Sequence, residues 1–513
     1  MTDQEHRERE TARRGAMAIG LIVAVAAALR FWGLSGGIPS SLGVDEPQIM
    51  VRSLAMVRSG DFNPHFFDYP GFYLYLQAGV IIAKFLAGAS SGAWSSLSQV
   101  GDHDFYLWGR AVSAAFGTAT VYVIYLAGRR WGTFHALLAA ALLAVLPMHV
   151  RESHFVLTDV PTAFFVALAF VLSLRAQERG TGSAFAWAGA AAGLATGTKY
   201  TAWVAILLPL AAAAMAAGPF DVRLRRAIAA SAAFFGAFLL VAPYTVLDLP
   251  GFLNGFGALA AGVPKRPASA EAGWVVYLKH LRIGLGWPGF ILAGAGLILF
   301  AVRAIRGPAR VGSVLVLLVM PVFWLMIIDR TLIFGRYLMP IIPFVCLLVA
   351  TGVVSCAGGL LRIPLPRMAA RALVVALAVA VLARPAFTSV SFDQDMSRPT
   401  TVGLAATWIS QHAKPGTRIV HELASLHFLP GQFYRVEYLT SLTEKGLDFY
   451  LGGKVDYVVA TSAVYDRYFA APDQFQEQCV AYQGLFKSLT PVFAVQGSDD
   501  HPGPEVRVFS VPK

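Results

Sequence analysis

The chain has 513 residues, of which 56% are hydrophobic and only 14% are charged. Soluble globular domains carry about a quarter of charged residues, so this composition excludes them and indicates a polytopic membrane protein. The net charge of +11 does not predict a nucleic acid partner, because the arginines form short clusters between apolar runs, a pattern that sets membrane topology. The three cysteines lack CxxC spacing and indicate neither a metal site nor a disulfide framework.

The first apolar run, Met17 to Leu34, is long enough to span a bilayer and follows Arg13-Arg14. The positive-inside rule places its far end on the non-cytoplasmic face. We expect residues 1–16 to form a disordered cytoplasmic tail. A cleaved signal peptide is the alternative, but the apolar run continues past the alanines that would form its cleavage site.

Two adjacent carboxylates, Asp45 and Glu46, follow this run. Acidic side chains are costly close to the membrane, and those that occur there often serve a function. A solvated acidic loop is the other interpretation of an isolated Asp-Glu pair. We predict an amphipathic helix from Pro47 to Val57 and treat Asp45 and Glu46 as the candidate catalytic centre.

The first outer segment, 35–107, also contains Asp68-Tyr69-Pro70 and an apolar run from Phe72 to Leu86. If this run crossed the membrane, Arg129-Arg130 at the end of the next run would lie outside. We therefore predict that residues 72–86 lie in the interface rather than span the bilayer.

With that choice, about eleven spans alternate so that every basic cluster lies in the cytoplasm. The membrane domain then covers residues 17–387, with a second long outer loop at 248–283. After the first span, the predicted spans are 108–128, 134–150, 160–174, 184–198, 201–217, 227–247, 287–302, 311–328, 338–354 and 373–387.

The composition changes after Phe387, where the apolar runs become short and alternate with polar residues. We predict that residues 388–513 form a soluble α/β domain on the outer face. Its expected elements are a helix at Thr401–His412 and strands at Arg418–His421, Asp456–Ala460 and Val506–Val511.

Polar residues next to the apolar runs gather on the predicted outer face. Asp159 begins one span, Lys199 lies in a tight hairpin, and Arg336-Tyr337 precede the tenth span. Each has an ordinary explanation, since Lys199 and Arg336 can extend to lipid headgroups and Asp159 can start a helix. Together, carboxylates that face a lysine and an arginine indicate a site that activates a nucleophile beside an anionic group of a lipid.

At these residues the chain resembles the GT-C superfamily of membrane glycosyltransferases, and most of all the bacterial relatives of protein O-mannosyltransferases and of lipid A aminoarabinose transferases. One departure is Gly71, which stands where the family has the second proline of a Pro-Pro element. The resemblance rests on Asp45-Glu46-Pro47, Asp68-Tyr69-Pro70-Gly71, Arg110, Asp159, the segment from Gly193 to Tyr200, and the segment from Phe334 to Pro340.

The resemblance implies a GT-C-like fold with an outer α/β domain. It also implies an enzyme that moves a sugar, with inversion, from a polyprenyl monophosphate to a lipid, glycan or protein acceptor on the outer face. The location it implies is a bacterial inner membrane, with the amino terminus in the cytoplasm. No nucleic acid partner and no obligatory cofactor are expected.

The roles that follow are assigned residue by residue. Asp45 is the expected base, Glu46 orients the acceptor and Asp159 is a second acid. Any divalent cation would be held by these three carboxylates. The other expected site residues are Lys199, Arg336 and Tyr337 around the donor phosphate, and Asp68, Tyr69 and Pro70 in a substrate loop.

A transporter is the alternative from another class, since acids and bases in membrane segments also mark transport pathways. Transporters usually place them near mid-membrane and often have paired halves, whereas here they lie at one face and no internal repeat is visible. An oligosaccharyltransferase is less favoured within the superfamily, because its Trp-Trp-Asp element does not occur in this sequence.

Overall fold

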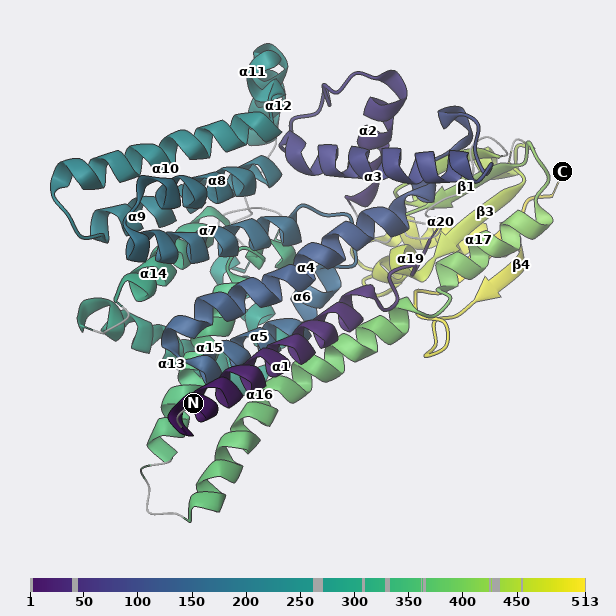
Figure 1. The fold of residues 1–513 in the computed structure, drawn as a ribbon. Helices are drawn as coiled ribbons and strands as arrows, with labels where there is room; N and C mark the ends of the chain where they lie inside the picture. The colour runs from purple at the N-terminus through teal and green to yellow at the C-terminus, as the bar shows by residue number, and fades with distance from the viewer. Residues whose placement is uncertain are drawn as a thin grey trace. The chain divides into compact units, whose positions relative to one another are not determined.

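The structure is a computed structural model in which the chain divides into two compact units. A helical unit contains residues 1–32 and 45–392, and an α/β unit contains residues 33–44 and 393–513. Figure 1 shows the helices and strands of both units. The described residues are 3–38, 45–261, 271–306, 310–327, 333–360, 362, 366–423, 426, 434–453 and 455–512.

Eight helices in the described part of the chain are long and apolar enough to cross a membrane, which confirms the predicted polytopic class. Three shorter apolar helices accompany them, α5 (Thr133–Val145), α9 (Leu207–Met215) and α14 (Arg310–Ile327). The eight are α1 (Asp3–Phe31), α3 (Gly71–Ser90), α4 (Tyr106–Gly128), α7 (Asp159–Arg179), α10 (Phe220–Val241), α13 (Gly273–Arg306), α15 (Ile342–Leu360) and α16 (Arg367–Met396).

Two stretches differ from the sequence prediction. Residues 3–16, expected to be a disordered tail, are the start of α1, where Glu10 and Arg14 pair one turn apart. The expected outer loop 248–283 contains α12 (Leu249–Ala261) and the first turns of α13. Within the two predicted outer loops, residues 39–44 and 262–270 lie outside the described residues.

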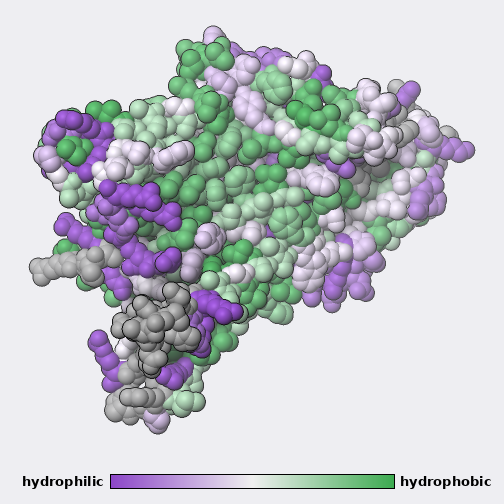
Figure 2. All heavy atoms as spheres, viewed as in Figure 1, coloured by the Kyte–Doolittle hydropathy of each residue, from purple (hydrophilic) through white to green (hydrophobic). Residues whose placement is uncertain are grey.

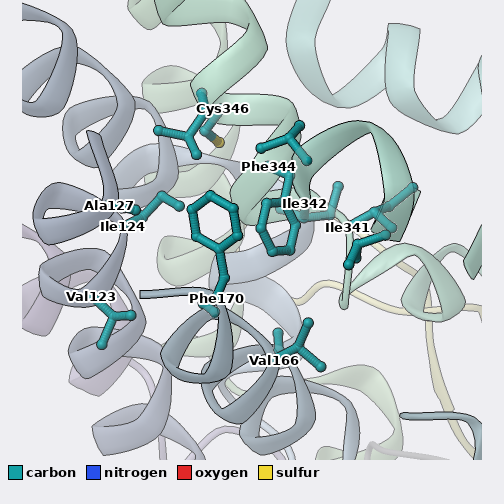
Figure 3. Close-up of a cluster of buried hydrophobic side chains, with 14 of the residues drawn as sticks. Val123, Ile124, Ala127, Val166, Phe170, Ile341, Ile342, Phe344 and Cys346 are labelled. Carbon is teal, nitrogen blue, oxygen red and sulfur yellow. The ribbon is translucent and has the colours of Figure 1, made fainter. Parts of the chain in front are cut away.

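The core of the helical unit is built around α7. Phe170 of α7 packs edge to face on Phe344 of α15, with ring centroids 5.1 Å apart. Side chains of α4, among them Ile124, complete this cluster (Figure 3). Because α7 begins at Asp159, the packing that holds α7 also fixes the position of this carboxylate.

Small residues bring α8 (Gly182–Thr198) against α10. A Cβ added at Gly189 or Gly193 would lie 2.0 Å from the carbonyl oxygen of Ala230 or 2.3 Å from that of Phe234. Only glycine therefore permits this approach, as is common in membrane helix pairs. The close contact fixes α8, and Lys199 follows its last residue.

Arginines in or next to the connecting segments, among them Arg130 and Arg226, lie at the end of the helical unit away from Asp159. Arg130 after α4 pairs with Glu178 near the end of α7, and Arg226 of α10 donates to a carbonyl oxygen in the α9–α10 connection. Hydrophilic residues gather at the end where α9 meets α10, while apolar residues cover the flanks of the helices (Figure 2). Since α7 runs from Asp159 to Arg179, this end is about 30 Å from Asp159.

Helix α3 runs beside only the first turns of α4. The Tyr73 hydroxyl lies 2.6 Å from the Ser113 hydroxyl, and Gln77 donates to the carbonyl oxygen of Gly109. The two contacts show that α3 and α4 are antiparallel, because the later residue of α3 meets the earlier residue of α4. The second half of α3 therefore continues past the start of α4. The length and composition of α3 are those of a spanning helix, and its interfacial location stays a prediction.

The α/β unit has a sheet in the order β2-β1-β3-β5-β4, in which β1 pairs in parallel with β2 and β3, and β5 pairs in antiparallel with β3 and β4. The predicted helix α17 (Thr401–His412) and the three predicted strands are present. Two strands were not predicted, β2 and β4. The strands are β1 (Arg418–Glu422), β2 (Arg435–Leu439), β3 (Tyr457–Thr461), β4 (Thr490–Val495) and β5 (Val506–Ser510).

A buried carboxylate joins the carboxyl ends of the parallel strands. Glu422, the last residue of β1, accepts hydrogen bonds from the backbone N–H groups of Thr461 and Leu442 and from the Tyr482 hydroxyl. Burial raises the pKa of Glu422 to about 7, although these hydrogen bonds lower it. Glu422 therefore has a structural role, since it links the carboxyl ends of β1 and β3 to the segment that follows β2.

Candidate active site

An ion pair joins the two segments that the sequence places farthest apart in the site. Arg336, in the short helix η5 (Gly335–Leu338), donates from Nη2 to Asp45 Oδ2 at 2.8 Å. The side chain of Asp45 is 20% exposed and that of Arg336 is 13% exposed. Both groups can thus be reached from outside the protein, as a site for substrate requires.

Asp159 and Lys199 form a second ion pair beside the first. Lys199 Nζ lies 2.6 Å from Asp159 Oδ1, and Arg336 Nε lies 4.0 Å from Asp159 Oδ2. Burial lowers the pKa of Arg336, but the carboxylates of Asp159 and Asp45 raise it above its ordinary value. The four side chains form an alternating row in which Arg336 bridges the two acids.

The two oxygens of the Asp45 carboxylate differ in their contacts with the described residues. Its Oδ2 accepts from Arg336 and, at 2.9 Å, from the Tyr69 hydroxyl, whereas among the described residues no donor reaches Oδ1. Burial and the charges of Asp45 and Asp159 raise the pKa of Tyr69, so Tyr69 is a neutral donor. One carboxylate oxygen is thus held in place and the other is available to accept a proton.

Glu46 points away from this row into the protein. Arg110 of α4 donates from Nε to Glu46 Oε1 and from Nη2 to Oε2, each at 2.8 Å, and Val156 N–H also donates to Oε1. Neither charged side chain is exposed. Glu46 is also the first residue of α2 (Glu46–Ser59), so the pair anchors the helix whose N-cap is Asp45.

Aromatic rings line the cationic side chains. Lys199 Nζ lies 5.0 Å from the ring centroid of Tyr337, and the Arg336 guanidinium lies 4.4 Å from that of Phe334. The two rings pack edge to face on each other. Such contacts between a cation and an aromatic ring are attractive and help to hold the Lys199 and Arg336 side chains in place.

The three residues of the expected substrate loop lie in different surroundings. Tyr69 contacts Asp45, as described above, and Pro70 is the N-cap of α3. Asp68 is exposed, and its charge acts on Arg52 and Tyr200 rather than on the row of ion pairs. The structure therefore brings Tyr69, but not Asp68, to the candidate site.

Glu152 is a further carboxyl near the row, and the sequence analysis gave it no role in the site. It ends α6 (Pro147–Glu152) and is 5% exposed. Burial raises its pKa to about 7, and the charges of Asp159, Arg336 and Lys199 all act on it. Its position between the apolar run 134–150 and Asp159 places it on the predicted outer face, but gives no sign that its side chain is buried.

The carboxylates expected to hold a divalent ion are already bound to cations. Asp45 contacts Arg336, Glu46 contacts Arg110, and Asp159 contacts Lys199. Within the described ranges, no group of three or more His, Cys, Asp or Glu side chains is arranged to hold a metal ion.

Sequence comparison identifies a related family. The sequence profile described as dolichyl-phosphate-mannose-protein mannosyltransferase matches residues 100–246, a stretch that contains Arg110, Asp159 and Lys199. No curated protein matches the chain. This match supports the resemblance predicted from the sequence over the centre of the helical unit.

Solved structures match nearly the whole chain. The apo oligosaccharyltransferase of Archaeoglobus fulgidus has a TM-score of 0.57 at 14% identity, over 90% of this chain and 71% of that chain. ArnT from Cupriavidus metallidurans bound to undecaprenyl phosphate has a TM-score of 0.53 at 19% identity, over 96% and 97%. AglB from Archaeoglobus fulgidus, in complex with an inhibitory peptide and a dolichol-phosphate, has a TM-score of 0.54 at 13% identity, over 92% and 72%.

These matches establish the class of the fold. The chain has the fold of these oligosaccharyltransferase and ArnT structures, with a polytopic helical unit and a carboxyl-terminal α/β unit. The resemblance and the fold class predicted from the sequence are thereby confirmed.

Proposed function

We propose that this protein is a glycosyltransferase that moves a sugar from a polyprenyl monophosphate donor to an acceptor on the outer face of the membrane, with inversion. The row formed by Asp45, Arg336, Asp159 and Lys199 carries this proposal. It combines a carboxylate that has an open oxygen with two cations near the end of the helices opposite the basic clusters.

The reaction is a single displacement at the anomeric carbon. The acceptor hydroxyl attacks this carbon while Asp45 Oδ1 takes the hydroxyl proton. The bond from the anomeric carbon to the phosphate oxygen breaks, and its electron pair stays on the phosphate. The products are the glycosylated acceptor and a polyprenyl phosphate that carries the additional negative charge.

Lys199 and Arg336 are proposed to bind the donor phosphate. Arg336 can bind two phosphate oxygens at once, whereas Lys199 acts as a point charge. Charge develops on the phosphate as the glycosidic bond breaks, so both cations stabilise the transition state more than the bound donor. Tyr337 restrains them, and Tyr69 holds the second oxygen of Asp45.

The related proteins support the donor class. The matching family profile is described by a lipid-phosphate sugar donor, and the matching structures of ArnT and AglB contain undecaprenyl phosphate and a dolichol-phosphate. We propose that the transferred group is a hexosyl or pentosyl group and that the acceptor is a lipid, a glycan or a protein. We also propose that the protein lies in a bacterial inner membrane with its amino terminus in the cytoplasm. Glu46 was expected to orient the acceptor substrate. We propose instead that it anchors α2 through its ion pair with Arg110.

The test is sugar transfer by the purified protein. Radiolabelled polyprenyl-phosphate sugars are supplied one at a time in detergent or liposomes, together with a cell-envelope extract that provides lipid, glycan and protein acceptors. Consumption of each donor is followed by chromatography. We expect one donor to be consumed by the unchanged protein and not by Asp45→Asn. A protein that consumes none of them, but moves one across a liposome membrane, would be a transporter instead.

A further inference from the structure

Glu152 is a buried carboxyl for which the proposed reaction has no use. Only 6% of its side chain is exposed, and its nearest charged partner is Arg151, whose Nη1 lies 3.4 Å from Glu152 Oε1. Arg151 itself is 63% exposed. Water therefore surrounds the partner but not the carboxyl, and this makes the ionised form of Glu152 costly.

Some charged groups of the neighbouring elements are bound to other partners, and the others act on Glu152. Arg30 of α1 is bound to His149 and to carbonyl oxygens at the end of α5, and Arg110 of α4 is bound to Glu46. The titratable residue of α5, His135, lies in its first turn at the other end. The groups whose charges act on Glu152 are Arg151, Asp159 from α7, Arg336 from η5 and Lys199 after α8.

The charge balance of the row changes when a donor binds. Asp45 and Asp159 balance Lys199 and Arg336, so the row is neutral without substrate. A donor phosphate adds one negative charge, and bond cleavage adds more. An ionised Glu152 would add a further negative charge in a place that water does not screen.

We propose that Glu152 takes up a proton when the phosphate of a polyprenyl donor binds between Lys199 and Arg336, so that donor binding is coupled to protonation of this side chain. The inference rests on the proposed function, because it needs an anion at these two cations. It assigns to Glu152 a role in charge balance, while Asp45 remains the base.

The direction of the effect follows from linkage. In the free protein, burial raises the pKa of Glu152 to about 7, with Asp159 also raising it and Arg151, Arg336 and Lys199 lowering it. A bound anion raises this pKa further, because it repels the ionised form. Below pH 7 Glu152 is protonated in both states, so affinity is constant. Above pH 7 the Kd rises by up to about tenfold per pH unit until the pKa of the complex is reached.

Binding of a stable donor analogue tests this coupling. The probe is the methyl phosphodiester of a polyprenol, whose single charge does not change between pH 5 and 9, added to the full-length protein in detergent. For the unchanged protein we expect a Kd that is constant from pH 5 to 7 and rises above pH 7. Glu152→Gln should bind tightly at every pH. The matched control Glu178→Gln, changed at an exposed glutamate at the basic end, should keep the slope.

Calorimetry on the unchanged protein gives a second measurement that needs no variant. Titrations at pH 8 in two buffers of different ionisation enthalpy report the protons taken up with each probe molecule, and we expect a value between a half and one. No uptake, or a slope that Glu152→Gln retains, would overturn the coupling and leave the proposed function intact. A probe that fails to bind at any pH would contradict the proposed function itself.

Discussion

Glu46 and Arg110 form a two-pronged ion pair in which neither side chain is exposed, although Asp45, one residue before Glu46, remains accessible. Removal of one member of a buried pair leaves an uncompensated charge, which costs about 3–5 kcal/mol. We expect Glu46→Gln to lower the free energy of unfolding by this amount and to reduce sugar transfer because α2 is displaced. Thermal unfolding in detergent measures the first effect.

A double variant separates the charge from the packing. When Glu46→Gln is combined with Arg110→Met, the charge of Arg110 is gone, while the amide oxygen introduced by Glu46→Gln can still accept from Val156 N–H. Much of the lost stability should return. If the double variant is no more stable than Glu46→Gln, the buried charge of Arg110 is not the cause.

The spans could be predicted because each is a local property of the sequence. An apolar run with arginine at one end is enough to predict a span and its direction. For example, a span was predicted at 160–174, and α7 is observed at Asp159–Arg179. The strands β2 and β4 lack such a signal. They are the two edge strands, β2 is largely exposed, and β4 contains Pro491 and a register shift.

The members of the candidate site could be predicted, but not their pairing. Topology alone placed Asp45, Asp159, Lys199 and Arg336 on one face. Which of two adjacent acids points inward depends on the start of α2, because successive side chains of a helix differ in direction by about 100°. The burial of Glu152 depends on the break between α5 and α6 at Leu146, which the continuous apolar run 134–150 conceals.

The orientation in the membrane is tested by labelling of single cysteines. With Cys356, the exposed native cysteine, changed to serine, cysteines at Ser96 and Ser410 should react with an impermeant thiol reagent added to intact cells, and one at Ser183 should not. All three positions are exposed, so a difference reports the side of the membrane. Reaction at Ser183 alone would reverse the proposed orientation.

The stability of the α/β unit should depend on pH through Glu422. An unfolded glutamate ionises near its ordinary pKa of 4.5, whereas burial raises the pKa of Glu422 in the folded unit to about 7. The folded unit therefore holds the proton more tightly, and its stability is highest below pH 4.5 and falls by roughly 3 kcal/mol as the pH rises through 7. Hydrogen exchange of β1 and β3 in the intact protein, corrected for the intrinsic rate, should show less protection at pH 8 than at pH 5. Glu422→Gln should remove this difference, and equal protection in the unchanged protein would contradict the prediction.

Asp45→Asn tests the assignment of the base. The amide keeps the shape of the side chain and an oxygen that can accept from Tyr69, but it cannot take the proton of the acceptor. We expect turnover to fall by on the order of 10² or more, with binding of polyprenyl phosphate retained. Asp61→Asn, at an exposed acid of the same outer segment, is the control and should transfer sugar normally. Near-normal turnover of Asp45→Asn would exclude Asp45 as the base.

Lys199→Met and Arg336→Gln test the donor phosphate site. We expect each change to affect the rate of sugar transfer more than the Kd of the donor. Charge on the phosphate increases as the glycosidic bond breaks, so each cation contributes more to the transition state than to the bound donor. Single-turnover transfer should therefore slow by a larger factor than the donor Kd rises. Arg336→Lys should recover only part of the rate, because lysine keeps the charge but cannot bind two phosphate oxygens together. Arg52→Gln, at an arginine that stacks on Phe66 outside the row, is the matched control. If Lys199→Met and Arg336→Gln both transferred sugar at the unchanged rate, the phosphate would bind elsewhere, while the assignment of Asp45 would remain open to its own test.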